Sequence, residues 1–343
     1  MPVDPIARNA SSSRRDFLRL AAAVGLLGPA GAGCRRSVPP ARPRHPLPAP
    51  SPLGPEYLAR GLVAMSDAHR RGWVQGHLGA AVVASYYFCR ENGLDERTSR
   101  ALRAQVDAFI ERRRPDFPSA NPGGGAADPA PIVEQLDRDI PRLRSGGHNA
   151  IYASLALRAL RDLPEFATPS VVEGIRRLLE VYAATARPVA ESRHNLEHPL
   201  PPYRGAQDIA AVTLRATLRP WSHVMEVGAS GVVHWVTHAE ALVTLDELGY
   251  GDVARRGHAA HQLQINRPVE GDETPAPERA PVDWLGPEYW ESDAPRRVLG
   301  DTWLFGHSFK LPYSLFRLLR CTDDPSLRSD CLARATKLSI PFE

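Results

Sequence analysis

The chain has 343 residues, and 42 lysine and arginine side chains against 39 aspartate and glutamate side chains give a formal net charge of +3. Arginine and acidic residues alternate without a basic block, which excludes the charge pattern of a nucleic-acid-binding protein. Hydrophobic residues make up 43% of the chain, which is enough for a sizeable core.

The N-terminus resembles a bacterial twin-arginine export signal. The motif SRRDFL at 13–18 precedes an apolar stretch, 20–27, that is too short to span a bilayer and fits a signal peptide. Cys34 follows small residues and is a candidate for lipidation, so 1–34 is interpreted as a signal peptide with a lipoprotein site. Residues 35–54, rich in proline and arginine, are predicted to form an extended tether. The chain is therefore expected on the periplasmic side, free or anchored to the membrane through Cys34.

Beyond the tether, apolar residues recur at spacings of three and four, the pattern of amphipathic helices. Asp95 and Thr168 are candidate N-caps, and Gly249 lies near a helix end. No segment alternates convincingly with period two. We predict an all-α fold of antiparallel helical hairpins, packed as a toroid-like or multi-helix bundle with little or no sheet. Helices are expected at 56–71, 77–92, 98–114, 132–144, 150–163, 171–186, 208–218, 232–249, 252–265, 308–319 and 327–338.

Two loops stand out between these helices. Residues 117–131 are rich in glycine and proline, and 266–290 is long and acidic; long loops of this kind tend to be lids or binding loops. Because no clean break divides the chain, residues 55–343 are predicted to form a single all-α domain. Cys321 and Cys331 bracket a short polar loop, where they could form a disulfide in an oxidising compartment or remain reduced thiols.

Four histidines lie at expected helix starts, each shortly after a glycine. His77, His148 and His307 follow a glycine directly, and His234 follows one by three residues. In a ring of helical hairpins the N-termini of the inner helices can converge on one cavity, which would gather the four imidazoles. We take His148, His234 and His307 as candidate proton donors or acceptors. Lys310, one helical turn after His307, is a candidate to stabilise negative charge on an oxygen.

A metal site is a second interpretation of the same region. His234 and His238 are four residues apart, so on a helix both imidazoles lie on one face and could bind one ion. His223, His307 or Glu226 would complete the ligand shell. Because the chain lacks HExxH, paired ExxH and CxxC motifs, the cofactor stays unknown, with a metal ion as the candidate.

Two functions of other classes stay open. A carbohydrate-active enzyme on a helical toroid would use two carboxylates from Asp208, Glu226, Glu240 and Asp301. A non-catalytic lipoprotein that binds a ligand or partner would carry its histidines as hydrogen-bonded core residues. No GxSxG motif and no glycine-rich phosphate loop is present.

Three segments carry a family resemblance. They are a His-led helix in SGGHNAIYASLALRAL, a His-x-Val-Thr segment in VVHWVTHAEAL, and a His-x-x-Lys helix in GHSFKLPYSLFRLL. In this order they are similar to the questin oxidase-like family, helical proteins linked to Baeyer–Villiger-type oxidation of aromatic polyketides. The resemblance implies an oxidoreductase that acts on an apolar or aromatic small molecule in a cavity lined by His148, His234 and His307.

Export bears on the electron source of such an enzyme. The family's oxidation is tied to a reduced nicotinamide, which is not expected outside the cytoplasm. An exported relative would need another electron source, a bound metal or a different reaction. The twin-arginine route carries folded proteins, and many of them load a cofactor before export, which favours a redox or metal protein. The sequence leaves the oligomeric state open.

Overall fold

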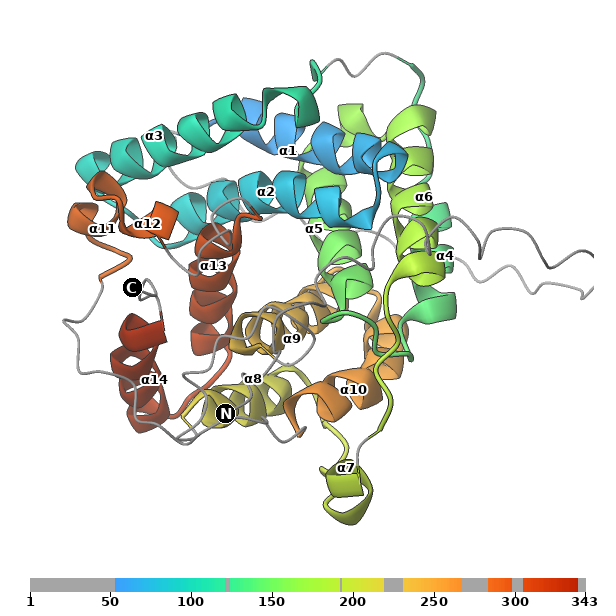
Figure 1. The fold of residues 1–343 in the computed structure, drawn as a ribbon, viewed down its shortest axis with the longest axis vertical. Coiled ribbons are helices and arrows are strands. Elements are labelled where there is room, and N and C mark those ends of the chain that lie inside the picture. The colour runs from blue at the N-terminus through green and yellow to red at the C-terminus, as the bar shows by residue number, and fades with distance from the viewer. Residues whose placement is uncertain are drawn as a thin grey trace, which may run out of the picture. The chain divides into compact units, whose positions relative to one another are not determined.

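The computed structural model describes residues 53–120, 124–191, 193–218, 231–266, 283–297 and 305–338. These residues belong to one compact unit and are helical, apart from turns, loops and one isolated β-bridge between Arg144 and Pro188 (Figure 1). The prediction of an all-α fold with little or no sheet is confirmed. No helix in these ranges combines the length and the hydrophobicity needed to cross a bilayer.

The α-helices are α1 (Pro55–Asp67), α2 (Gly76–Glu91), α3 (Glu96–Arg112), α4 (Ala130–Asp139), α5 (His148–Asp162), α6 (Pro169–Thr185), α7 (Arg193–Glu197), α8 (Ala206–Thr217), α9 (Val232–Glu247), α10 (Gly251–Ile265), α11 (Pro287–Glu291), α12 (Ala294–Arg297), α13 (His307–Arg320) and α14 (Pro325–Leu338). Short 3-10 helices lie at Ala68–Arg70, Trp73–Gln75, Arg114–Asp116 and Pro164–Phe166.

The two predicted N-cap residues make capping hydrogen bonds, and the predicted glycine turns the chain after α9. The Asp95 carboxylate accepts a hydrogen bond from the Thr98 backbone N–H at 2.6 Å and caps α3. The Thr168 hydroxyl accepts one from the Val171 N–H and caps α6. After α9 the chain turns at Gly249, whose φ of +95° a side chain would strain.

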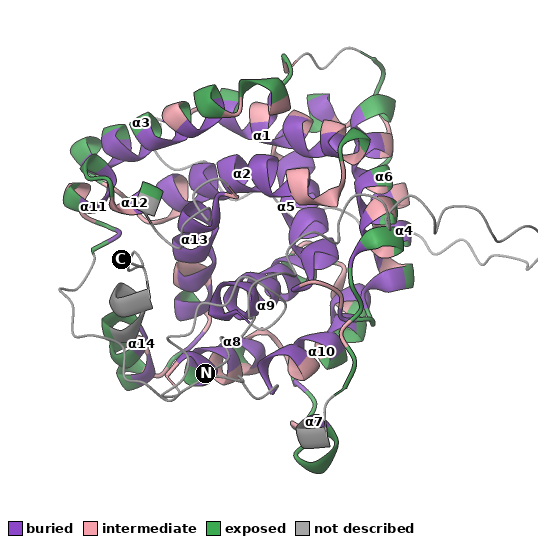
Figure 2. Cartoon of the chain, viewed as in Figure 1, coloured by how far each residue is buried: buried purple, intermediate pink, exposed green. Residues whose placement is uncertain are grey.

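Four helices, α2, α5, α9 and α13, form the centre of the fold. α2 packs against α5, α5 against α9, α9 against α13 and α13 against α2, so the four close into a ring (Figure 1). α2 and α9 are apolar almost all round, and Figure 2 shows these inner helices buried for most of their length. A helix without a polar face belongs in the interior, which explains why α2 and α9 lie at the centre of the fold.

The remaining helices lie outside this ring. α1 packs on α2 and α6, α6 packs on α4, and α8 and α10 pack on α9. α3 and α4 have a polar face towards solvent and an apolar face towards the core, as their sequence periodicity predicts. Where α1 crosses α2, Gly61 and Gly79 allow the two backbones to approach more closely than any side chain would permit.

The loop predicted at 266–290 contains a short helix near its end. α11 begins at Pro287 and places Tyr289 and Trp290 in the core, where the indole of Trp290 stacks on Phe309 at 6.0 Å between ring centres. Residues 267–282 lie outside the described ranges.

A buried polar cluster joins the inner helices away from their N-terminal ends. The Glu240 carboxylate of α9 accepts hydrogen bonds from the Tyr313 hydroxyl at 2.8 Å and the Thr244 hydroxyl at 2.5 Å, and lies 3.6 Å from the Arg317 guanidinium. The Arg158 guanidinium of α5 donates to the Tyr313 hydroxyl at 2.8 Å.

The same cluster reaches α2 through Glu91. Its carboxylate is paired with Arg158 and receives a hydrogen bond from Arg320 at 2.6 Å. The Arg158 guanidinium also lies 3.8 Å from the centre of the Tyr87 ring. Each inner helix thus contributes at least one charged side chain to one connected set.

Truncation of Glu240 should be strongly destabilising. Glu240→Ala leaves the Tyr313 hydroxyl and the Arg317 guanidinium with one partner fewer in the interior, so we expect a loss of about 3–5 kcal/mol in the free energy of unfolding. Urea unfolding followed by circular dichroism measures it. Glu288→Ala, at an exposed carboxylate, is the matched control and should change stability by about 0.5 kcal/mol or less. Equal effects of the two substitutions would contradict the structural role of the cluster.

Candidate metal centre

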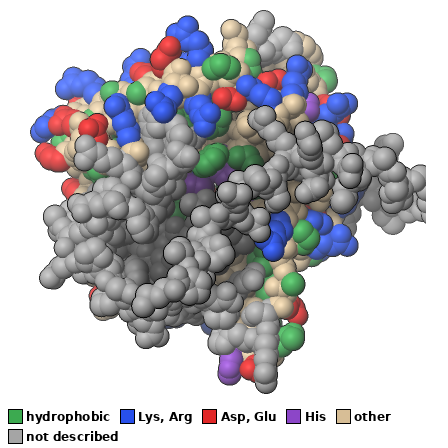
Figure 3. Space-filling view, in the orientation of Figure 1, with side chains coloured by type: hydrophobic (Ala, Val, Ile, Leu, Met, Phe, Trp, Pro, Cys, Tyr) green, Lys and Arg blue, Asp and Glu red, His purple; other side chains and the backbone are tan. Residues whose placement is uncertain are grey.

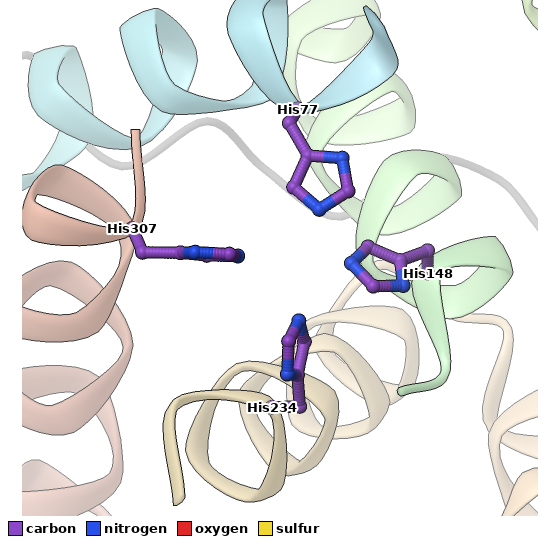
Figure 4. A group of neighbouring side chains, drawn as sticks. All are labelled: His77, His148, His234 and His307. Carbon is purple, nitrogen blue, oxygen red and sulfur yellow. The ribbon is translucent and has the colours of Figure 1, made fainter. Parts of the chain in front are cut away.

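Four buried imidazoles meet where the inner helices begin. His77 is the second residue of α2, His148 the first of α5, His234 the third of α9 and His307 the first of α13. Figure 4 shows the four rings pointing from four helices towards a common centre. Each ring offers one nitrogen atom to this centre, and these four nitrogens all lie within 4.8 Å of one another.

The rings follow the same circular order as their helices. The distance between ring centres is 4.3 Å from His77 to His148, 4.8 Å from His148 to His234, 5.0 Å from His234 to His307 and 5.3 Å from His307 to His77. Metal–imidazole bonds of about 2.0–2.1 Å place nitrogens about 3.4 Å apart in a tetrahedron and about 4.1 Å apart across a square. An inward movement of about 1 Å would therefore bring the four rings to ligand distance.

Hydrogen bonds to the backbone orient two of the rings. Nδ1–H of His77 donates to the Val74 carbonyl at 2.8 Å, and Nδ1–H of His148 donates to the Ser145 carbonyl, in each case three residues earlier. A histidine held in this way presents the lone pair of Nε2 to a metal. Nε2 of His148 is buried and has no hydrogen-bond partner among the described residues, and the same holds for Nε2 of His307.

The centre favours uncharged imidazoles. Burial, followed by the influence of Lys310, holds the pKa of His77 and of His307 well below the usual 6.5. Burial, followed by the influence of His234, does the same for the pKa of His148. Helix N-termini carry partial positive charge, which opposes protonation further. Neutral imidazole is the form that binds a metal ion.

Among the described residues, Lys310 is the lysine that lies near these rings. It lies one turn after His307 on α13, only 2% exposed, and burial holds its pKa well below 10.5. The chain has two lysines among its 42 basic residues, Lys310 and Lys337. Arginine cannot lose its proton in a protein, so only lysine at this position could give up its proton and act as an amine base.

A tight turn seats His148 against α9. Gly146 and Gly147 have φ values of +84° and +78°, which side chains rarely adopt. A Cβ on Gly146 would come within 2.8 Å of the His234 ring, and one on Gly147 would collide with the His238 ring. The Gly-Gly-His sequence is therefore needed both for the turn and for the approach of α5 to α9.

The predicted site residues divide into three groups. His148, His234 and His307 lie together as expected, with Lys310 beside them. His77 completes the cluster, and its Gly-His helix start was the sequence signal for it, although it was left out of the predicted catalytic set.

The two histidines of the predicted ligand pair, His234 and His238, lie in different surroundings. His238 is one turn further along α9, where its Nδ1 lies 2.8 Å from the Gln264 side-chain oxygen on α10, so it does not belong to the cluster. The i,i+4 spacing put both rings on one side of the helix, but only tertiary packing decides which ring reaches the centre. The third predicted ligand, His223, lies outside the described residues.

The carboxylates considered for sugar chemistry do not form a pair in the described part. Asp208 lies in the first turn of α8, 3.6 Å from the Arg204 guanidinium, whereas Glu240 belongs to the buried polar cluster. Glu226 and Asp301 lie outside the described residues. Cys321 and Cys331 are free thiols with different neighbours, the Arg317 carbonyl for the first and the Leu214 carbonyl for the second.

No known family model matches the chain, and no curated protein and no solved structure matches it either. What the centre does must therefore follow from its own chemistry. A ligand set made only of imidazoles suits zinc, copper, iron and nickel.

The lowered pKa values predict a specific pH dependence of stability. Between pH 6.5 and about pH 5 the unfolded chain takes up protons on imidazoles that stay neutral in the folded protein, so stability falls as pH falls. His148→Gln should make this slope shallower by up to about 1.4 kcal/mol per pH unit. Urea unfolding of the metal-free protein at several pH values measures it. His69→Gln is the control, because His69 makes the same Nδ1 bond to a carbonyl three residues earlier but lies outside the cluster; an equal effect of both substitutions would contradict the burial argument.

Gly147→Ala should disrupt the centre. The added methyl group collides with the His238 ring at a strained φ, so α5 must shift and carry the His148 ring away from its neighbours. We expect a loss of stability of about 1–3 kcal/mol and weaker metal uptake. Gly205→Ala, at a glycine with open space around it and an extended φ, is the control and should leave both unchanged. A normal metal affinity in Gly147→Ala would show that this turn does not set the position of His148.

Proposed function

We propose that the protein is an exported, metal-dependent oxidoreductase. Its four imidazoles would hold one first-row transition metal ion, and its substrate would be an apolar or aromatic small molecule. The observation that carries this proposal is the convergence of four buried imidazoles from four helices on one point, where burial lowers the pKa of His77, His148 and His307. Redox chemistry and the aromatic substrate come from the family resemblance, and export comes from the twin-arginine motif.

The donor set supports a metal over a purely acid–base site. Within the described ranges, the Nε2 atoms of His148 and His307 are buried with no hydrogen-bond partner, which costs about 1–3 kcal/mol each unless a ligand uses them. The group of four clustered side chains contains no carboxylate from the described residues. A bound ion would supply Lewis-acid or electron-transfer chemistry, while the chain's own residues hold and orient it.

The surroundings of the centre suit an aromatic substrate. The half-buried Trp73 ring lies 5.1 Å from His148 and 5.8 Å from His77, and Phe305 lies 5.7 Å from His77. Figure 3 shows histidine and hydrophobic side chains together at the middle of one face. An aromatic molecule that entered here would meet aromatic edges and faces, which pack well against one another.

Lys310 would act on the substrate's oxygen atoms. A neutral amine in an apolar site can donate a hydrogen bond to an oxygen on which negative charge develops, and can accept a proton from it. His148, His234 and His307 would bind the metal in this proposal, so proton transfer would fall to Lys310 and to groups outside the cluster. No described pair of carboxylates supports the carbohydrate-active alternative.

Metal loading tests the proposal. The purified protein should bind one equivalent of Co(II), Fe(II), Cu(II) or Zn(II), measured by dialysis and elemental analysis, with an affinity that falls at least tenfold in His148→Ala and in His307→Ala. His69→Ala, which removes a histidine outside the cluster, should bind normally. Protein that binds none of these ions would leave a non-catalytic binding lipoprotein as the better interpretation. Full affinity in both cluster variants would place the metal elsewhere.

A further inference from the structure

The four inner helices direct positive N-terminal ends at the four-histidine centre. Each is at least 14 residues long, and the N-terminus of such a helix carries partial positive charge and backbone N–H groups without helical partners. None of the four has a side-chain cap or an acidic residue in its described first turn. The outer helices differ, because α3 is capped by Asp95, and α1, α8 and α10 each carry an acidic residue in the first turn.

Lys310 adds a hydrogen-bond donor at the same place. It lies on the side of α13 that carries His307, only 2% exposed, and close enough to His77, His148 and His307 to oppose their protonation and lower the pKa of each. Burial lowers the pKa of Lys310 itself, and no carboxylate of the described residues offsets this effect. The amine therefore lies in the interior without an acidic partner from the described part of the chain.

A metal ion at this centre would need a negative charge beside it. Imidazole ligands are neutral, so a divalent ion would keep its two positive charges in a buried site, which is costly without a counter-charge. Among the described residues, the two buried carboxylates are Asp139 and Glu240. The first accepts a hydrogen bond from the Arg144 guanidinium, and the second lies 3.6 Å from the Arg317 guanidinium in the buried polar cluster. Both are thus engaged by arginines, and an anion that enters the site would supply the missing charge.

The unpartnered ring nitrogens indicate that the centre itself takes a ligand. Nε2 of His148 and Nε2 of His307 are buried without a partner in the described ranges, and Figure 4 shows both rings directed at the common centre. On the same side, the aromatic rings of Trp73 and Phe305 lie 5.8 Å and 5.7 Å from the His77 ring. A ligand that combines negative charge with an aromatic ring would therefore suit both parts of the site.

We propose that the centre binds a carboxylate together with the metal ion, and that the substrate is an aromatic carboxylate. A carboxylate is ionised at neutral pH, so it brings its negative charge without first losing a proton in the site. Its charge would balance the metal ion and the four helix ends, its oxygens would accept hydrogen bonds from Lys310, and its ring would pack against Trp73 and Phe305. The inference rests on the proposed function, because it names the substrate class of that same centre.

Calorimetric titration of the zinc-loaded protein with three small molecules tests the inference. Benzoate is an aromatic carboxylate, benzamide has nearly the same shape without the charge, and acetate has the charge without the ring. Benzoate should bind at least tenfold more tightly than either of the others. Because binding is reciprocal, saturating benzoate should also raise the affinity for zinc by the factor by which zinc raises the affinity for benzoate. Acetate that binds as tightly as benzoate would mean that the site takes a free small anion, and would overturn the aromatic carboxylate as substrate.

Lys310→Met tests the part of the amine. It removes the donor but keeps a long side chain in the interior, so the affinity for benzoate should fall at least tenfold while that for benzamide stays unchanged. Arg100→Met is the control, because it removes an exposed cation paired with Glu96 on α3, and it should keep both affinities. Equal affinities of the wild type for benzoate and benzamide, or an unchanged affinity for benzoate in Lys310→Met, would overturn the inference and leave the metal centre standing. A wild-type protein that binds no zinc would instead overturn the proposed centre, and the inference with it.

Discussion

The meeting of four helix N-termini at one point is the constraint on which the rest of the structure depends. Each inner helix brings a histidine in its first turn, and the ring order of the helices becomes the ring order of the imidazoles. The partial positive charge of the helix ends and the burial of the site both oppose protonation. The geometry therefore favours uncharged imidazoles in an apolar setting. A bound metal ion would stabilise this arrangement, because it would use ring nitrogens that otherwise lie buried without a partner in the described part of the chain.

Glycine makes this convergence possible at the level of the backbone. Gly147 and Gly306 have left-handed φ values directly before His148 and His307, so the chain can turn sharply into each helix. Further along the inner helices, Arg158, Glu240 and their partners tie the same elements together by hydrogen bonds and ion pairs. Close approach of the backbones thus fixes the inner helices at their N-terminal ends, where the histidines lie. The buried polar cluster fixes the same helices further along.

Much of this could be predicted from the sequence because it is local. Helix periodicity gave the all-α fold, the caps at Asp95 and Thr168 mark real helix starts, and the glycine–histidine starts pointed to His148 and His307. What could not be predicted depends on packing between distant segments. His234 and His238 have the same spacing as a ligand pair, yet α10 offers Gln264 to His238 and so separates their roles. The partners of Glu240 come from α13 and from its own helix; the apolar sequence around it indicates burial, but nothing in the local pattern identifies Tyr313 as its partner.

The central claim is that all four imidazoles bind one metal ion. X-ray absorption spectroscopy of the cobalt-loaded protein tests it most directly, because imidazole ligands give a distinctive multiple-scattering pattern. We expect a shell of about four imidazole nitrogens at about 2.0–2.2 Å, reduced by one in His77→Ala. A shell made mainly of oxygen ligands, or one unchanged in His77→Ala, would contradict it.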